Sequence, residues 1–230
     1  MSAAPDTTGS IDGVDCCSKE DSAFDREFNA RTAEEDLRSY RRDGPTGLTK
    51  DLIDALSAGG IEGRTILEIG GGVGTVHHEL LRSGAGTAVD VDASRAYVTA
   101  AREEAERQGH ADRVEYRVGD FVALAHEISP ADVVALDRVL CCYGDMTSLV
   151  ARSAALAKRK YGLVYPRDTW LGRLMIALLT VGLLVSRSPF RTYLHRTADV
   201  DAILNAHGLV KSLHKTTLVW QLAVYERPAA

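Results

Sequence analysis

The stretch TILEIGGGVGTVHHEL, residues 65–80, places four glycines within five positions, directly after an apolar run and just before two histidines. Glycine loses more backbone entropy on folding than other residues, so such a cluster serves either a turn or a closely approaching ligand. RTILEIG predicts a buried strand, and residues 73–83 predict the helix after it. In open α/β sheets, ligands bind where such loops leave the carboxyl ends of the strands. The stretch therefore predicts an α/β fold with a binding site at the glycine loop.

Strands and helices are expected to alternate on both sides of this loop. The expected helices cover residues 18–42, 46–58, 94–108, 145–158, the apolar run 174–185 and a segment near 198–207. The further expected strands are GTAVDV, RVEYRVGD, ADVVALD, YGLVYP, LVKSLHK and TLVWQLAVYER. The last two are joined by only a residue or two around Lys215 and Thr216, so they must run antiparallel. The pattern predicts a Rossmann-like, doubly wound, seven-stranded sheet with the last strand antiparallel, flanked by helices.

The chain length of 230 residues suits one domain with appendages. We expect a disordered N-terminal segment over residues 1–17 and a helical lid over 18–58. Residues 59–230 would then form the main domain, with an apolar helical insert near 168–195. Tyr40 closes the first expected helix and is a candidate to cover a bound ligand, the alternative being a solvated helix end.

Charge is unevenly distributed along the chain. Residues 1–150 hold 15 basic and 28 acidic side chains (net −13), whereas residues 151–230 hold 12 basic and 4 acidic ones (net +8). The basic third is suited to an anionic substrate or a membrane surface, or it is simply a solvated face. The overall charge of −5 and the absence of an aromatic platform in this third argue against nucleic acid as a partner.

The cysteines and the N-terminus predict a cytoplasmic protein. The four cysteines form two adjacent pairs, Cys16–Cys17 and Cys141–Cys142, without the spacing typical of zinc sites. The polar and acidic N-terminus does not resemble a signal peptide. The longest apolar run has 12 residues, fewer than the roughly 20 that cross a bilayer.

Acidic residues follow the first three strands of the expected sheet. Glu68 precedes the glycines, Asp90 ends the second strand, and GDF, residues 119–121, follows the third. A carboxylate at the end of the second strand can accept hydrogen bonds from ribose hydroxyls. An acid and an apolar ring after the third can bind the amine and the face of adenine. This arrangement predicts a pocket for an adenine nucleoside.

The motifs LEIGGGVG, VDVDAS and VGDF resemble those of class I S-adenosylmethionine-dependent methyltransferases in order and spacing, over about residues 45–225. The resemblance implies S-adenosylmethionine as cofactor and methyl transfer to a small, lipophilic molecule. It also implies the residues that bind the cofactor: Glu68, Gly70, Gly72 and Gly74 under the methionine and ribose, Asp90 on the ribose, Val91, Asp120 and Phe121 around the adenine, and Asp137 and Arg138 at the methionine end. Alternatives are a protein that binds S-adenosylmethionine without turnover and an arsenite-type methyltransferase that uses Cys141 and Cys142.

A looser resemblance connects ADVVALDRVLCCYGD, YGLVYPRDTW and the segment FRTYLHRTADVDAILNAHGL to relatives of magnesium-protoporphyrin O-methyltransferases. CCYGD stands where this group is expected to carry a His-Tyr-Pro type of sequence. The porphyrin substrate is therefore not carried over.

Two residues are candidates for roles at the acceptor. His195 is a candidate general base because the pKa of histidine lies near neutrality, the alternative being a hydrogen-bonded packing residue. Tyr143 would orient an acceptor or form the wall of the pocket.

His77 and His78 are adjacent on a helix and make a poor chelate, so we expect one of them to be exposed. Cys141 and Cys142 are expected to be free, partly buried thiols at the pocket.

The segment DTWLGRLMIALLTVGLLVSRSPFRTYLH, residues 168–195, carries a helix that is apolar on nearly every side. Such a helix is buried on the sheet, lies in a membrane interface, or covers an apolar ligand. Its ends are flanked by arginines: Arg167, Arg173, Arg187 and Arg191. These favour a lipophilic acceptor with an acidic group, and peripheral membrane contact as a second partner.

Overall fold

The computed structural model describes residues 27–185 and 190–228. The predicted disordered segment, residues 1–17, lies outside the described residues. The helices are α2 (Ala30–Asp43), α3 (Gly47–Ser57), α4 (Thr75–Arg82), α5 (Arg95–Gln108), α6 (Phe121–Leu124), α7 (Met146–Leu156), α8 (Trp170–Val185) and α9 (Thr197–Ala206). Short 3₁₀ turns are η1 (Ala111–Arg113), η2 (Ala125–Glu127) and η3 (Leu140–Cys142).

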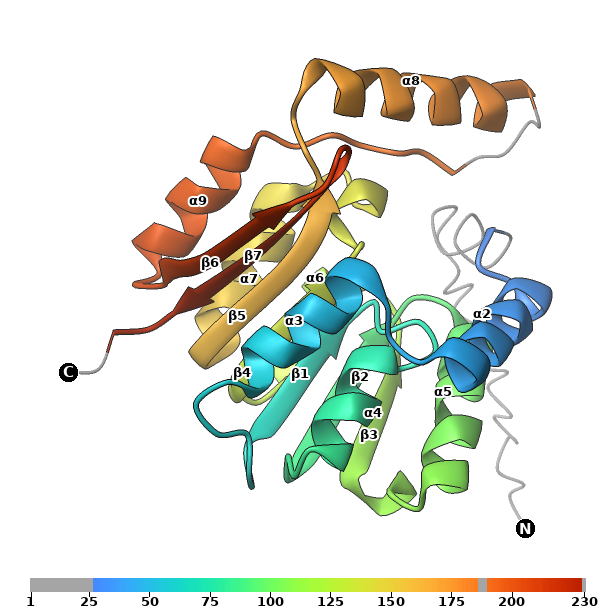
Figure 1. Ribbon diagram of the computed structural model, residues 1–230, viewed down its shortest axis with the longest axis vertical. Coiled ribbons are helices and arrows are strands. Elements are labelled where there is room, and N and C mark those ends of the chain that lie inside the picture. Colours follow the sequence, from blue (N-terminus) through green and yellow to red (C-terminus); the bar gives the residue numbers. More distant parts are fainter. Residues whose placement is uncertain (1–26, 186–189, 229–230) are drawn as a thin grey trace, which may run out of the picture.

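The seven strands form one sheet (Figure 1). They are β1 (Thr65–Ile69), β2 (Thr87–Asp92), β3 (Val114–Val118), β4 (Ala131–Asp137), β5 (Ala157–Pro166), β6 (Val210–Thr216) and β7 (Trp220–Glu226), in the spatial order β3-β2-β1-β4-β5-β7-β6. Strands β1 to β5 pair in parallel, whereas β7 pairs antiparallel with both β5 and β6. The predicted doubly wound sheet with its last strand reversed is confirmed. The reversed strand lies inside the sheet rather than at its edge.

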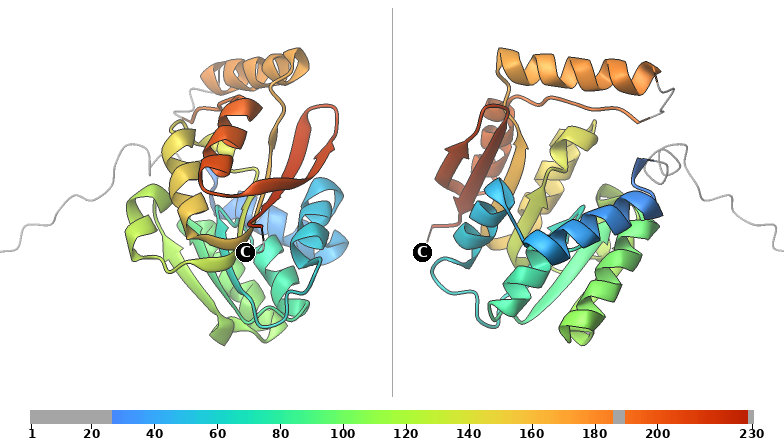
Figure 2. Two further views of the ribbon diagram at one scale, coloured as in Figure 1. Left: turned by 90° about the vertical axis from the view of Figure 1, so that its left-hand side faces the viewer. Right: turned by 45° about the vertical axis from the view of Figure 1, so that its right-hand side comes forward.

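Helices cover both faces of the sheet, as the apolar strands require. On one face Leu52, Leu56 and Leu80 of α3 and α4 pack against Ile66 and other strand residues. On the other face α7 and α9 bury Leu149, Val150 and Leu204. α5 lies beside α4, and α2 packs outside it (Figure 2). α3 belongs to the layer of helices on the sheet, so only the residues before α3 could act as the lid predicted over residues 18–58. The lid itself stays a prediction.

The apolar helix α8 differs from the other helices because it does not lie on the sheet. It crosses one end of the molecule, above the extended segment 190–196 that leads to α9 (Figures 1 and 2). Of the three alternatives for this helix, packing on the sheet is therefore wrong: Leu178, for example, is 65% exposed. Among the described helices, none is both long and apolar enough to cross a bilayer.

Candidate active site

A cavity of about 1070 Å³ opens at the carboxyl ends of β1 to β4. Its floor is the glycine loop, and its sides come from the residues after β2, β3 and β4. Phe28, before α2, and Phe190, after α8, meet across it with ring centroids 5.4 Å apart. Arg191 and Tyr193 line the same cavity. It therefore joins the predicted nucleoside pocket to the segment that follows the apolar helix.

The glycine loop adopts backbone conformations that other residues rarely tolerate. Gly70 and Gly72 have φ of 63° and 58°. A Cβ on Gly70 would lie 2.7 Å from Cγ2 of Val139, so the loop also approaches the segment after β4 closely. Gly74, with φ of 80°, begins α4. The glycines are thus required by the turn itself, and Gly70 and Gly72 face the cavity as predicted.

The ribose ligand predicted from the sequence needs a correction. Asp90 is 0% exposed and does not line the cavity, because its carboxylate lies behind the loop: a Cβ on Gly71 would be 2.4 Å from its Oδ1. Neither of its oxygens has a hydrogen-bond partner among the described residues. Burial, with Glu68 and Asp92 nearby, raises the pKa of Asp90 well above its usual value. A side chain buried in this place does not face the cavity and cannot reach a ribose there.

Asp92, two residues further along β2, lines the cavity instead. Its Oδ2 accepts a hydrogen bond from the Gly72 amide (3.0 Å), and its Oδ1 accepts one from the Ser94 amide (2.8 Å). These bonds fix the carboxylate between the glycine loop and the start of α5, and each oxygen keeps further acceptor capacity. The sequence held a signal for this residue, because VDVDAS carries a second aspartate nearer the carboxyl end of the strand.

Glu68 is held by the helix that the glycine loop begins. Its Oε2 accepts a hydrogen bond from the His77 amide (2.9 Å) and lies 2.7 Å from Nδ1 of the same histidine. The residue lines the cavity but is only 1% exposed. Burial is the main reason that the pKa of Glu68 rises to about 8, and the carboxylates of Asp137 and Asp92 add to the effect.

His77 and His78 are both 0% exposed, so the expectation that one of them is exposed is wrong. Nδ1 of His78 lies 2.8 Å from Nε2 of His110, and Nε2 of His77 lies 3.3 Å from the Tyr116 hydroxyl. Burial lowers the pKa of His77 to about 3. Both imidazoles are therefore neutral packing groups, and their hydrogen bonds explain how polar rings come to lie in the core.

Asp137 and Arg138 follow β4, and both line the cavity. Oδ2 of Asp137 accepts a hydrogen bond from the Thr49 hydroxyl (2.6 Å), while its buried Oδ1 accepts no hydrogen bond from the described residues and lies 4.0 Å from Nε of Arg138. Arg138 has φ of 61°, the one positive value among the described non-glycine residues, and its amide donates to the Val164 carbonyl. Strain of this kind gathers at functional sites. An acceptor oxygen at this place suits a cationic group of a ligand.

The predicted adenine residues also lie together. Val91 and Phe121 are buried members of the same apolar cluster, and both line the cavity. Asp120 caps α6 through its Oδ1, which accepts from the Val122 amide, and the same oxygen accepts the Tyr143 hydroxyl at 2.8 Å. Tyr143 therefore links the adenine end to the segment after β4. This contact favours a wall role for Tyr143, since its hydroxyl proton is directed at Asp120.

Tyr40 lies at the rim of the cavity, with its ring near that of His78. Its hydroxyl donates to Oε1 of Glu79 (2.8 Å) and accepts from Nε2 of Gln108 (3.2 Å). The ring is available to a ligand, but its polar end is already bonded to α4 and α5.

His195 does not line the cavity. Its Nε2 lies 2.9 Å from the carbonyl oxygens of both Leu140 and Tyr143. Carbonyls only accept hydrogen bonds, so this nitrogen carries the proton and cannot act as a base. These contacts, and the place of His195 outside the cavity, favour the predicted alternative of a hydrogen-bonded packing residue over the general base. His195 instead attaches the segment 190–196 to η3, together with the Tyr193 amide, which donates to the Cys141 carbonyl at 2.8 Å.

We therefore expect His195→Ala to lower the melting temperature, while turnover per folded molecule and cofactor affinity stay within about twofold. Loss of the bonds from Nε2 costs about 1–2 kcal/mol, or several degrees for a domain of this size. His195→Gln keeps a donor near the Nε2 position without a titratable ring, so it should regain part of the lost stability. A large drop in turnover in both variants at unchanged melting temperature would show instead that His195 acts as a general base.

Cys141 and Cys142 are free thiols with their sulfurs 3.6 Å apart. Cys142 lines the cavity, whereas Cys141 is buried and its thiol donates to the Arg138 carbonyl. Of the two thiols expected at the pocket, Cys142 lies there, and Cys141 is buried behind the cavity wall.

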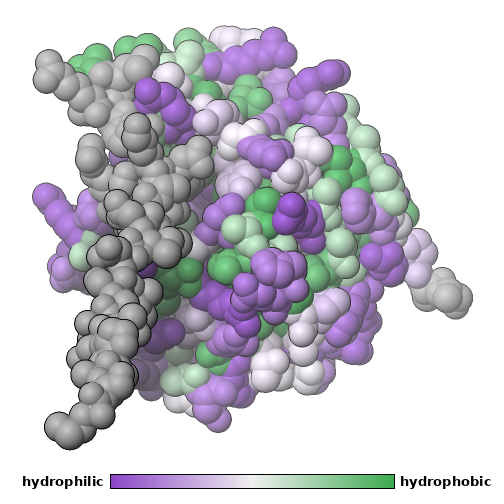
Figure 3. All heavy atoms as spheres, turned by 180° about the vertical axis from the view of Figure 1, so that it is seen from behind, coloured by the Kyte–Doolittle hydropathy of each residue, from purple (hydrophilic) through white to green (hydrophobic). Residues whose placement is uncertain are grey.

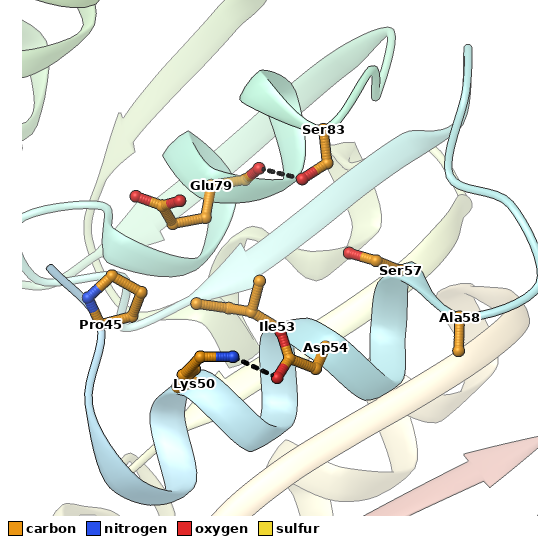
Figure 4. Close-up of a pocket in the computed structure, with 8 residues that line it drawn as sticks. All are labelled: Pro45, Lys50, Ile53, Asp54, Ser57, Ala58, Glu79 and Ser83. Carbon is orange, nitrogen blue, oxygen red and sulfur yellow. Dashed lines mark hydrogen bonds and ion pairs between the residues drawn. The ribbon is translucent and has the colours of Figure 1, made fainter.

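A second hollow, of about 410 Å³, lies between α3 and α4 (Figure 4). No residue of the glycine loop lines it. Its polar side chains bond locally: Lys50 pairs with Asp54, and the Ser83 hydroxyl donates to the Glu79 carbonyl. The glycine loop and the buried carboxyl groups described above line the larger cavity, so we place the active site there.

Residues 66–160 match the family model described as "Methyltransferase domain". Within these residues the chain therefore carries a methyltransferase domain, and its sheet with the reversed β7 has the fold of the solved methyltransferases described below. One solved structure of the same fold contains bound SAM. The glycine loop and the carboxyl groups of Asp92 and Asp137 line the cavity of this protein, and their arrangement is consistent with that ligand.

Three solved structures show the extent of the likeness. Magnesium protoporphyrin IX methyltransferase from Synechocystis PCC 6803 with bound SAH is 22% identical, with 91% of this chain and 100% of that chain covered and a TM-score of 0.67. An O-methyltransferase family protein from Burkholderia thailandensis is 20% identical (90% and 63% covered, TM-score 0.67). An O-methyltransferase family 2 protein from Planctomyces limnophilus DSM 3776 in complex with apigenin is 21% identical (93% and 63% covered, TM-score 0.61). At these identities the likeness shows the fold. No curated protein matches the sequence.

Proposed function

We propose that this protein transfers the methyl group of S-adenosylmethionine to a small, lipophilic acceptor that carries an acidic group. The observation that carries the proposal is the continuity of the cavity from the glycine loop to Tyr193. Its volume of about 1070 Å³ is large enough for a cofactor and an acceptor side by side.

The half of the cavity next to the glycine loop suits the cofactor. Glu68, Asp92 and Asp137 bring three carboxyl groups to the ends of β1, β2 and β4. Burial raises the pKa of Glu68, and repulsion from the carboxylates of Asp137 and Asp92 raises it further. A cationic ligand relieves that repulsion. S-adenosylmethionine supplies a sulfonium and an ammonium group. In the proposed arrangement Asp92 accepts the ribose hydroxyls, and Oδ1 of Asp137 faces the methionine end.

The other half of the cavity suits an apolar molecule with a negative end. Phe190, Tyr193, Val139 and Leu149 contribute apolar surface, and Arg191 contributes a cation. A carboxylate acceptor needs no base, because it is already deprotonated and attacks the sulfonium methyl in line. This chemistry agrees with the place of His195 outside the cavity. Positioning of the acceptor is then the main task of the protein.

The acceptor class is tested with labelled methyl donor and matched pairs of compounds, each an aromatic or long-chain carboxylic acid and its primary amide. We expect label in the methyl ester of the acids and none in the amides. Arg191→Ala should raise KM for the acids about tenfold, the effect of one charge-assisted hydrogen bond, without changing cofactor affinity. Arg173→Ala is the control, since Arg173 does not line the cavity. Equal labelling of acid and amide would contradict the proposal.

The alternative, a protein that binds S-adenosylmethionine without turnover, predicts tight binding of the cofactor and no labelled product from any acid, phenol, thiol or amine. The same assay therefore separates the two functions.

A further inference from the structure

Helix α8 carries a solvent-facing apolar stripe. It consists of Trp170, Leu174, Leu178, Val181 and Val185, which are 75%, 47%, 65%, 56% and 80% exposed. Their spacing of three and four residues places them on one face of the helix. Soluble monomers rarely leave such a contiguous apolar surface uncovered, and those that do use it for binding.

A different side of α8 contacts the rest of the protein. The Thr180 hydroxyl lies 3.2 Å from that of Thr192, in the extended segment beneath the helix. Figures 1 and 2 show α8 across one end of the molecule, with this segment between it and the sheet. In Figure 3 hydrophobic atoms gather along the upper edge, where the helix lies. The stripe therefore points away from the body of the protein.

The charges around the stripe have one sign. Residues 167–197 contain five arginines and one acidic residue. The acidic residue, Asp168, accepts a hydrogen bond from the Thr197 hydroxyl, whereas Arg173, Arg191 and Arg196 are exposed. Two copies of this face would bring like charges together, which opposes self-association. A negatively charged apolar partner fits the surface better.

We propose that α8 docks this protein onto the surface of an anionic lipid bilayer, with the helix lying in the interface. At 16 residues, or about 24 Å, the helix is shorter than the hydrocarbon core, so it lies on the bilayer rather than across it. The stripe enters the boundary between headgroups and acyl chains, Trp170 sits at the level that indole rings prefer, and the positive charge of the surrounding arginines attracts the anionic surface.

Docking in this orientation brings the active site to the lipid surface. The chain that leaves α8 supplies Phe190, Arg191 and Tyr193 to the cavity. A lipophilic acid dissolved in the bilayer would thus meet the acceptor half of the cavity. This last step rests on the proposed function, whereas the docking itself rests only on α8 and its charges.

The test is flotation of the full chain with vesicles of phosphatidylcholine, alone or mixed with phosphatidylglycerol. We expect the protein to float with the anionic vesicles only, and less so as salt is raised. Leu178→Asp and Val181→Asp should each lower partitioning at least about tenfold, because a carboxylate opposes both burial and the anionic surface. Val210→Asp is the matched control: Val210 is 54% exposed on β6, and its substitution should leave flotation unchanged.

Every variant is first titrated with S-adenosylhomocysteine, so that only folded protein is compared. Failure of the wild-type chain to float with anionic vesicles, or unchanged flotation of both stripe variants, would overturn the docking. So would a dimer in light scattering that Leu178→Asp converts to a monomer, since a second copy would then cover the stripe. A wild-type chain that floats but methylates no lipophilic acid would count against the proposed function and leave the docking in place.

Discussion

Asp92→Ala is expected to weaken the binding of S-adenosylhomocysteine by about ten- to a hundredfold, while Asp90→Asn changes it by less than about threefold. Asp92 faces the cavity and is fixed by the amides of Gly72 and Ser94. Its removal takes away the acceptors for two ribose hydroxyls and also releases the loop. Asp90 lies behind the loop with no exposed surface, and asparagine has nearly its shape.

Isothermal titration of both variants measures the difference directly. The thermal midpoint of each protein without ligand serves as the control for folding. The opposite ranking, with Asp90→Asn weakening binding and Asp92→Ala leaving it intact, would show that the first aspartate of VDVDAS holds the ribose after all.

Gly72→Val is expected to abolish measurable binding of S-adenosylhomocysteine, with a moderate loss of stability. A Cβ at this position meets only the Tyr97 ring, at 3.5 Å, so the side chain can be accommodated. The φ of 58° costs about 1–2 kcal/mol for a residue with a side chain. The added atoms stand at the wall of the cavity where the cofactor approaches the loop.

Gly71→Val provides the contrast within the same loop. Its Cβ would lie 2.4 Å from Oδ1 of Asp90, a group that is buried and cannot move into solvent. We expect this variant to unfold or to melt far below Gly72→Val. The readout is the thermal midpoint with and without ligand, because a ligand at about a hundred times its Kd adds about 2.7 kcal/mol to a protein that binds it. A Gly72→Val protein that is stabilised by ligand as much as the wild type would contradict the placement of the cofactor over this loop.

The fold could be predicted from the sequence because its signals are local and repeated. Most strands are apolar runs bounded by turns, and Gly109 and Gly208 follow helices where the sequence placed their ends. The short link between the last two strands predicted their antiparallel pairing. The hairpin spans residues 217–219, slightly later than expected, because β6 continues to Thr216. Nothing local revealed that β7 inserts between β5 and β6, since that depends on pairing between distant strands.

The site was predicted less completely because side-chain direction depends on tertiary packing. Asp90 and Asp92 alternate with Val91 on the same strand, so both point to one face, and only the position of the glycine loop decides which one reaches the cavity. His77 and His78 are buried because Glu68 and His110, distant in sequence, offer them partners. Thr49 was missed for the same reason, as its bond to Asp137 joins residues 88 positions apart.

The apolar run in α8 shows the limit of composition as a guide. A helix that is apolar on nearly all sides predicts burial, yet its stripe faces outward. Composition does not reveal whether an apolar helix is covered by its own protein or by a partner such as a bilayer. The arginines around it carry the information that favours a lipid.

The central claim is methyl transfer in the cavity between the glycine loop and Tyr193. The most direct test is the transfer of a labelled methyl group from S-adenosylmethionine to a lipophilic carboxylic acid by the wild-type chain, with Asp92→Ala beside it. We predict a labelled methyl ester with the wild type, inhibition by S-adenosylhomocysteine, and a strong loss of product with the variant at the same donor concentration. Tight binding of S-adenosylhomocysteine by a wild-type chain that labels no acid, phenol, thiol or amine would contradict the claim.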